Sequence, residues 1–389
     1  MPNVESGNWI ENPNISIEIA KEIEKAYWKE CKIEAVLGRG ENRALRSFQV
    51  KSSAPYRPRI KQRLLGDGVE GNADFDSNVD KMEIFATTLY PKVIGNSLNS
   101  DIEFYSLMNN IDFAKEASES LKSWMVDKVN RSIVAALAND ITNIVVADAT
   151  RGVKDSSAKA SVAEACKAIV KGDTLTVATI RRAIFMAKTG LDYKNGKAST
   201  IKPTRITTKT IAGVETDIFS YLILLDTYQV EQIKKDPEWI EAQKALATNK
   251  GLDAGFFTGL VGVIDGCPVI DMGVWTSDQV GLPNSQTNDT EFRNSLNLQN
   301  HSKIVTPSAY ANSQPVSFGY LVGANALLAV GTPQARVLFE KRDYGRKTGI
   351  AVDRVLTIAK GRFDMSSSES WGYLHDKDIG IIGIASSLE

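Results

Sequence analysis

The longest regular pattern of apolar and polar positions in the chain runs from about residue 110 to residue 149. It contains neither proline nor glycine, and its apolar side chains recur every three to five residues, as they do on one face of a helix. These positions are Phe113, Ala117, Leu121, Trp124, Val129, Ile133, Leu137, Ile141 and Ile144. The pattern predicts a helix about 55 Å long if it is unbroken. It is either an ordinary amphipathic helix or a spine along which other elements are arranged.

The segment before this helix predicts a long two-stranded excursion from the body of the protein. Residues 64–108 begin rich in Gly, Asn and Asp and then become apolar. Residues 81–93 alternate loosely, with Met82, Ile84, Tyr90 and Val93 available for one side of a strand.

The segment after the helix predicts a mixture of helices and strands. Residues 221–225 form an apolar strand pattern, Asp226 and Asp236 suit helix N-caps, and Asp265-Gly266 between two apolar arms predicts a hairpin. Residues 276–317 are rich in Asn, Ser, Gln and Thr, which predicts an exposed loop or insertion. Residues 321–331 suggest a short helix, and strand-like pieces follow at 336–340, 350–359 and 379–384.

A basic stretch lies near the N-terminus and contains a single acid, Glu41. Its cations are Arg39, Arg43, Arg46, Lys51, Arg57, Arg59, Lys61 and Arg63. It is either a solvated loop or an extended arm. An arm could lie across a neighbouring subunit or face packaged nucleic acid, where arginines would meet carboxylates or phosphates.

Composition narrows the class of protein. With 389 residues the chain can form two or three domains, and its net charge of −1 gives no global field for polyanions. Cys31, Cys166 and Cys267 are odd in number and far apart, which fits a reducing compartment. We find no signal-peptide pattern and no apolar run of 18 residues, so we expect a soluble protein made in cytoplasm.

The candidate motifs for catalysis or cofactor binding lack the sequence context that these functions require. The sequence GDGVEG at 66–71 matches a dinucleotide-binding pattern but lacks the preceding apolar strand and the following helix. His301 and His375 have no ligand partners at metal-binding spacing, and Asp376 with Asp378 suits a solvated turn better than a catalytic pair. We therefore expect no catalytic residue, no cofactor, no metal and no enzymatic activity.

Several segments, taken in order, carry a family resemblance. They are GDGVEG at 66–71, AKEASESLKSWMVDKVNRSIVAAL at 114–137, LILLDTYQVEQIKKDPEWIEAQKAL at 222–246, GLVGVIDGCPVI at 259–270, LVGANALLAVG at 321–331 and EKRDYG at 340–345. Together they resemble the major capsid proteins of tailed double-stranded DNA bacteriophages, in their N-four-like branch. The resemblance covers roughly residues 60–389.

The resemblance implies an α+β fold of the Hong Kong 97-like type. Its parts would be an N-terminal arm at 1–63, an extended β-hairpin loop at 64–108, and a peripheral domain with the spine helix at 109–172. An axial α/β domain would follow at 173–317, and strands returning to the peripheral domain at 318–389.

The implied function is self-assembly into pentamers and hexamers of an icosahedral shell around double-stranded DNA, which the inner face would contact without sequence preference. Further implied partners are scaffolding and portal proteins and a cement or decoration protein, with no membrane. The implied location is the virion, assembled in the host bacterial cytoplasm. Alternatives are an encapsulating compartment shell of the same fold, a cytosolic α/β enzyme, or a free nucleic-acid-binding protein.

We expect contacts between subunits from the arm, the extended loop and a charged run near the C-terminus. The candidates are Arg39, Arg43, Arg46, Arg57, Arg59, Arg63, Met82, Ile84, Tyr90, Glu340, Arg342, Asp343 and Arg346.

Overall fold

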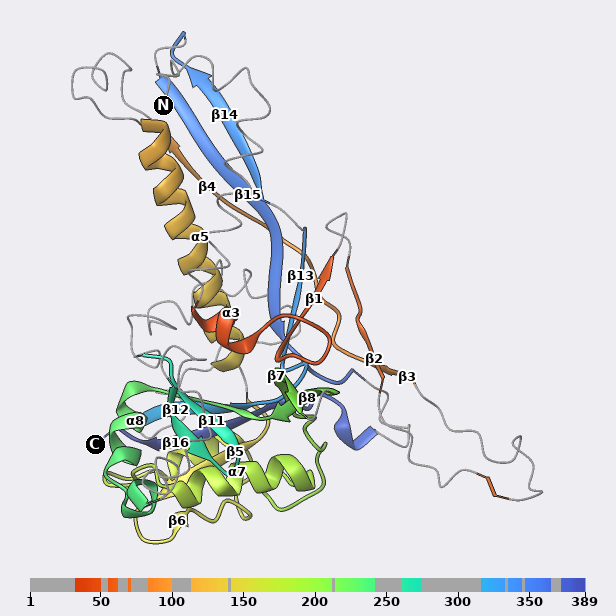
Figure 1. The fold of residues 1–389 in the computed structure, drawn as a ribbon, viewed down its shortest axis with the longest axis vertical. Helices are drawn as coiled ribbons and strands as arrows, with labels where there is room; N and C mark the ends of the chain where they lie inside the picture. The colour runs from red at the N-terminus through yellow and green to blue at the C-terminus, as the bar shows by residue number, and fades with distance from the viewer. Residues whose placement is uncertain are drawn as a thin grey trace.

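The computed structural model describes residues 32–49, 55–61, 69–70, 83–99, 113–138, 141–211, 214–241, 260–273, 316–332, 335–344, 347–364 and 372–388. These residues form an α+β fold with two main sheets. One long helix and several long strands build an elongated part above a compact lobe of sheet and helices (Figure 1).

The elongated part is a five-stranded sheet with α5 (Phe113–Ala138) on one face. Its strands are β1 (Leu45–Gln49), β4 (Val93–Asn99), β13 (Leu327–Gly331), β14 (Arg336–Arg342) and β15 (Lys347–Lys360). β15 is the longest strand and pairs with β13 and β14 in turn, while β4 takes its other edge. Because one strand pairs with three others, it holds this sheet together along its length.

The long helix is present but shorter than its pattern predicts. α5 has 26 residues, which corresponds to about 39 Å. It ends at Ala138, and the predicted continuation is wrong because Ile144–Asp148 is strand β5. Asn139 and Asp140 are poor helix formers. The β-branched residues that follow them pair with another strand, and this pairing outweighs the helical period.

The lower lobe is a seven-stranded sheet of order β10-β11-β9-β12-β16-β5-β6. Its strands are β5 (Ile144–Asp148), β6 (Gly152–Val153), β9 (Leu222–Leu225), β10 (Leu260–Ile264), β11 (Cys267–Asp271), β12 (Val316–Val322) and β16 (Ile381–Ser387). Apolar residues of α7 (Val177–Thr189) and α8 (Thr227–Lys234) share one core with this sheet. A shorter helix, α6 (Val162–Lys167), packs near β5. Every residue of β12 and β16 is buried, as expected for central strands covered on both faces.

Several local predictions in this lobe are confirmed. The apolar strand β9 leads into α8 with Asp226 as extended N-cap residue, and a further helical turn starts at Pro237 after Asp236. β10 and β11 form a hairpin through Asp265 and Gly266, whose φ angles of 48° and 78° are those of a type I′ turn.

The predicted helix at 321–331 is wrong. Its first two residues end β12 in one sheet, and Leu327–Gly331 forms β13 in the other. The connection turns at Asn325, which has a φ of 58°. Leu and Ala favour helix in isolation, but pairing of β13 with β1 and β15 overrides this weak preference.

Three small elements complete the described fold. β2 (Arg59–Lys61) pairs with β3 (Glu83–Phe85), and β7 (Thr204–Ile211) forms a hairpin with β8 (Val214–Ser220). The short helix α3 (Lys32–Leu37) packs against α5, and η3 (Gly372–Leu374) precedes β16.

The predicted segments 1–63 and 318–389 do not each form one separate part of the structure. Part of the region assigned to an N-terminal arm is inside the fold, because Leu37 and Leu45 are fully buried and β1 pairs with β13. Residues 318–389 contribute strands to both sheets. The domain boundaries themselves stay predictions.

Candidate assembly surfaces

One face of the five-stranded sheet is turned away from α5 and carries exposed apolar side chains. Leu338 on β14 is 48% exposed and Val93 on β4 is 61% exposed. Their partners on β15, Ala351 and Val355, are four residues apart and therefore point to the same side of the sheet. Phe339, next along β14, packs against the core that includes α5. We call the face that carries Leu338 and Val93 the outer face.

Four charged side chains of the outer face are paired within the subunit. Arg336 meets Asp353 on β15 in a two-point contact, with Nε 2.9 Å from Oδ1 and Nη2 2.5 Å from Oδ2. Arg342 Nη2 lies 2.6 Å from Glu340 Oε2, and this pairing raises the pKa of Arg342 and lowers that of Glu340. Exposed pairs of this kind contribute little to stability. Together with the apolar patch they resemble the composition of a protein interface with a polar rim.

The same sheet leaves strand edges open. In the described part of the chain, β14 and β4 each pair with β15 alone, so each presents its second edge without a strand partner. The turn after β14 places Asp343 and Tyr344 at positive φ, and the Tyr344 side chain is fully exposed. Open edges of this length commonly pair with another chain.

The base of the predicted excursion is anchored on the body. Tyr56 and Leu89 exchange two backbone hydrogen bonds of 2.7 Å, and β2 and β3 pair next to them. Ile60, Ala86 and Leu89 are buried in a small core with residues of β13. Residues 56–61 and 83–89, on either side of residues 62–82, are therefore held together and fixed to the five-stranded sheet. Residues 93–99, also assigned to the excursion from the sequence, form β4 of that sheet.

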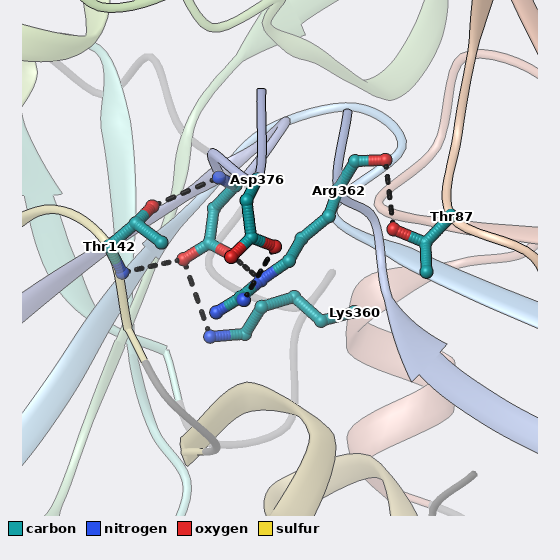
Figure 2. A network of polar contacts seen from close by, with 6 residues as sticks. Thr87, Thr142, Lys360, Arg362 and Asp376 are labelled. Atoms are coloured by element: carbon teal, nitrogen blue, oxygen red, sulfur yellow. Dashed lines mark hydrogen bonds and ion pairs between the residues drawn. The ribbon is translucent and has the colours of Figure 1, made fainter. Parts of the chain in front are cut away.

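Figure 2 shows a buried network of charged side chains near the end of β15 and the start of β16. Asp378 Oδ1 accepts a hydrogen bond from Arg362 Nε at 3.0 Å, and Asp378 Oδ2 lies 3.4 Å from Lys360 Nζ. The three side chains are between 1% and 5% exposed. Arg362 also pairs with Asp376, which is 61% exposed. Two cations thus meet two carboxylates, and one end of the network reaches solvent.

The network connects segments that are far apart in sequence. Thr142, just before β5, donates its backbone N–H to Asp378 Oδ2 at 3.0 Å and accepts from the Asp378 N–H through its hydroxyl at 2.9 Å. Thr87, at the base of the excursion, donates its N–H to the Arg362 carbonyl at 3.0 Å. The network therefore joins both sheets to the base of the excursion (Figure 2).

The arginines predicted as subunit contacts mostly have partners within their own chain. Arg39 pairs with buried Glu34, and Arg43 donates to the Ile206 carbonyl at 2.9 Å. Burial lowers the pKa of Arg43, with a further contribution from nearby Arg205.

The remaining candidates lie at several places on the surface. Arg46 packs over the Phe48 ring, Arg57 Nη2 lies 3.0 Å from Asp364 Oδ2, and Arg59 is exposed on β2. Tyr90 is partly buried and accepts a hydrogen bond at its carbonyl, and Ile84 lies on β3. Glu340, Arg342 and Asp343 are exposed at the end of β14.

Three candidates, Arg63, Met82 and Arg346, are outside the described residues. The role of all thirteen between subunits stays a prediction.

Sequence reasoning missed the buried network. The expectation that Asp378 lies in a solvated turn is wrong, because its side chain is 1% exposed, whereas it holds for Asp376. The sequence feature that could have predicted the network is the pair of cations Lys360 and Arg362 at the end of an apolar strand pattern. Charges at such a position need a partner if the strand continues into the core.

Two further observations concern metal binding and membrane crossing by the described residues. Among them, no group of three His, Cys, Asp or Glu side chains could hold a metal ion. None of the described helices has both the length and the apolar character needed to cross a membrane.

Comparisons with known proteins identify the fold and the family. Residues 57–388 match the phage capsid protein family. The chain is 39% identical over 402 residues to the major structural protein ORF14 of Helicobacter pylori bacteriophage KHP30, covering 100% of this chain and 98% of that protein. It superposes on the head structure of Helicobacter pylori bacteriophage KHP40 with a TM-score of 0.74 at 37% identity, covering 100% of this chain and 99% of that one.

A distant relative shows the fold alone. The capsid of Ralstonia phage GP4 matches with a TM-score of 0.60 at 15% identity, over 92% of this chain and 91% of that chain. The capsid fold implied by the sequence resemblance is thus confirmed. The chain belongs to the phage capsid protein family, and it is a structural protein of a bacteriophage capsid, not an enzyme.

Proposed function

We propose that copies of this chain assemble into pentamers and hexamers of an icosahedral shell that encloses double-stranded DNA. The observation that carries the proposal is the outer face, which exposes Leu338 and Val93 on a sheet whose β14 and β4 edges have no strand partner among the described residues. A subunit that worked alone would gain nothing from an apolar sheet face in water. A neighbouring copy would bury this face and could continue the sheet from either edge.

The physical design suits repeated assembly. A closed shell requires many interfaces of modest strength, so that misplaced subunits can dissociate while the completed lattice persists. The paired charges around Leu338 give orientation without a large net attraction. The anchored base of the excursion would direct the residues beyond it toward a neighbour.

Further partners are part of the same proposal. Scaffolding and portal proteins would guide assembly in the host bacterial cytoplasm, and a cement or decoration protein could bind the finished shell. Contact with packaged DNA would be independent of its sequence, because phosphate recognition by Lys and Arg carries no base information.

The direct test removes the apolar patch of the outer face. In the variant Leu338→Ser with Val93→Ser, we expect a folded subunit that fails to form closed shells. The unfolding free energy should change by less than about 1 kcal/mol, since both side chains are exposed. Electron microscopy and size-exclusion chromatography measure assembly, and urea denaturation confirms folding.

A matched control changes exposed residues of similar character elsewhere. Tyr228 on α8 is 40% exposed and Phe185 on α7 is 48% exposed. The variant Tyr228→Ser with Phe185→Ser should assemble as the wild type does. Normal shells from the outer-face variant would refute the proposed use of this face. Wild-type particles that contain a protein cargo instead of DNA would favour the compartment-shell alternative.

A further inference from the structure

A cavity lies at the edge of the seven-stranded sheet, where β6 separates from β5. The two residues of β6 pair with Ala147 and Asp148 of β5. The next hydrogen bond between the two segments runs from the Lys154 N–H to the Val146 carbonyl at 2.9 Å. Beyond it the chain turns away and leaves a space of about 260 Å³, which is open to solvent and bordered by α7 and by the turn at 192–196. This volume would hold several water molecules or a small ligand.

The charged groups that line the cavity are mainly cationic. They are Arg151, Lys154 and Arg182, against the single carboxylate of Asp155. Lys154 is neutralised by Asp173, with Nζ 2.5 Å from Oδ2. Asp155 accepts the Ser157 N–H at 2.9 Å, and this contact lowers its pKa. Arg182 and Arg151 thus supply the remaining positive charge beside the cavity, and Arg151 also contributes to the lowered pKa values of Asp155 and nearby Asp148.

Arg182 differs in its partners from the arginine next to it on α7. Arg181 forms ion pairs with Glu238 and Asp265. Arg182 Nη2 donates to the neutral amide oxygen of Asn195 at 2.5 Å, and its guanidinium lies over the Phe185 ring. Within the described residues Arg182 forms no ion pair with a carboxylate, because its contacts are this amide and this ring. A guanidinium that keeps its charge beside a cavity is a typical recognition group for an oxyanion.

The wall opposite α7 is held in place. Asp192 Oδ1 accepts the backbone N–H groups of Lys194 and Gly196, at 2.9 and 2.6 Å. The Tyr193 hydroxyl donates to the Ala160 carbonyl at 3.2 Å. Asn195, at a φ of 58°, uses its Oδ1 for Arg182, and its Nδ2 therefore carries its donors. A site with fixed donors loses little conformational entropy when it binds.

We propose that this cavity binds a phosphate group, with Arg182 and Arg151 supplying charge and the Asn195 Nδ2 a neutral hydrogen bond. A tetrahedral dianion suits donors that approach from three elements, namely α7, the turn after β5 and the turn at 192–196. The charge of Arg182, together with that of Arg151, favours an anion at this position. The phosphate can be free in solution or part of a nucleic acid. The inference does not depend on the proposed assembly.

The experiment titrates the full chain with inorganic phosphate by calorimetry, at constant ionic strength, and repeats the titration with a short single-stranded oligothymidylate. The wild type should bind at least one of the two. Arg182→Gln should lose about tenfold or more in affinity, since a hydrogen bond to a charged group is lost. Arg181→Gln is the matched control and should bind as the wild type does, because its guanidinium already has two carboxylate partners.

The two titrations distinguish the sources. Displacement of the oligonucleotide by phosphate assigns the site to nucleic acid, and binding of phosphate alone assigns it to a free anion. The inference is overturned if neither ligand binds at millimolar concentration, if Arg182→Gln binds as tightly as the wild type, or if a glutamate-rich peptide binds where phosphate does not.

Discussion

Arg362 and Asp378 form an ion pair in the interior of the protein, with Nε 3.0 Å from Oδ1 and both side chains at most 2% exposed. The pair lies where β15 ends and β16 begins. Its neighbours Thr142 and Thr87 connect it to β5 and to the base of the excursion. A single buried contact thus joins the two sheets and an element proposed to bridge subunits.

Removing the buried carboxylate should strongly destabilise the subunit. In Asp378→Asn, the charges of Arg362 and Lys360 stay buried while their main counter-charge is lost, so we expect a loss of about 3–5 kcal/mol in unfolding free energy. Urea denaturation of the isolated subunit measures this. The control Asp376→Asn removes an exposed partner of the same arginine and should cost less than about 1 kcal/mol. Equal effects from both variants would contradict the assignment of Asp378 as the centre of the network.

Gly323 should not tolerate a side chain. A Cβ at this position would lie 2.2 Å from Ile201 Cγ2 and 2.6 Å from the Lys202 carbonyl oxygen, and backbone cannot move as a side chain can. We expect Gly323→Ala to lower the unfolding free energy by about 1–3 kcal/mol. Gly383→Ala, on the neighbouring strand β16, is a matched control, because its closest contact is the end of the Ile141 side chain at 3.2 Å. It should cost clearly less in the same denaturation assay.

The buried thiols should be unreactive in the folded subunit. Cys166 is fully buried, and this burial raises the pKa of its thiol, so it stays protonated at pH 8. Cys267 is 2% exposed and lies 3.3 Å from the Ser220 hydroxyl. In a Cys31→Ser background we expect no fast reaction with a disulfide reagent at pH 8, and two equivalents in urea. A fast-reacting thiol in the folded protein would show that one of these sites is open.

Asp148 should contribute a pH-dependent increment of stability. Its carboxylate accepts the N–H groups of Arg151 and Thr150, and these bonds lower the pKa of Asp148. Because the folded pKa is lower than the unfolded one, the increment is present above the unfolded pKa of about 4 and is lost as pH falls through the folded pKa. The urea midpoint of Asp148→Asn should therefore lie below that of the wild type at pH 7. The two midpoints should converge in acid, and a constant difference down to pH 2.5 would argue against a charge effect.

The sequence alone was sufficient for the family, for the existence of a long helix and for the hairpin at Asp265 and Gly266. These features depend on local conformational preferences, on short-range periodicity and on the order of motifs, all of which can be read directly from the sequence. Glu340 and Arg342, predicted from the sequence as subunit contacts, are exposed in the structure, and their role between subunits stays a prediction.

Tertiary structure decided where the long helix ends, which conformation residues 327–331 adopt and which charged groups are buried. The helix ends at Ala138 because the residues beyond it pair with β16, and residues 327–331 form a strand because β1 and β15 lie on either side of them. Asp378 is buried because Arg362, sixteen residues earlier, meets it in the fold. The sequence states which groups carry charge or apolar surface. Which of them are brought together depends on pairing between distant segments, whose energy exceeds the local preferences that a sequence pattern reports.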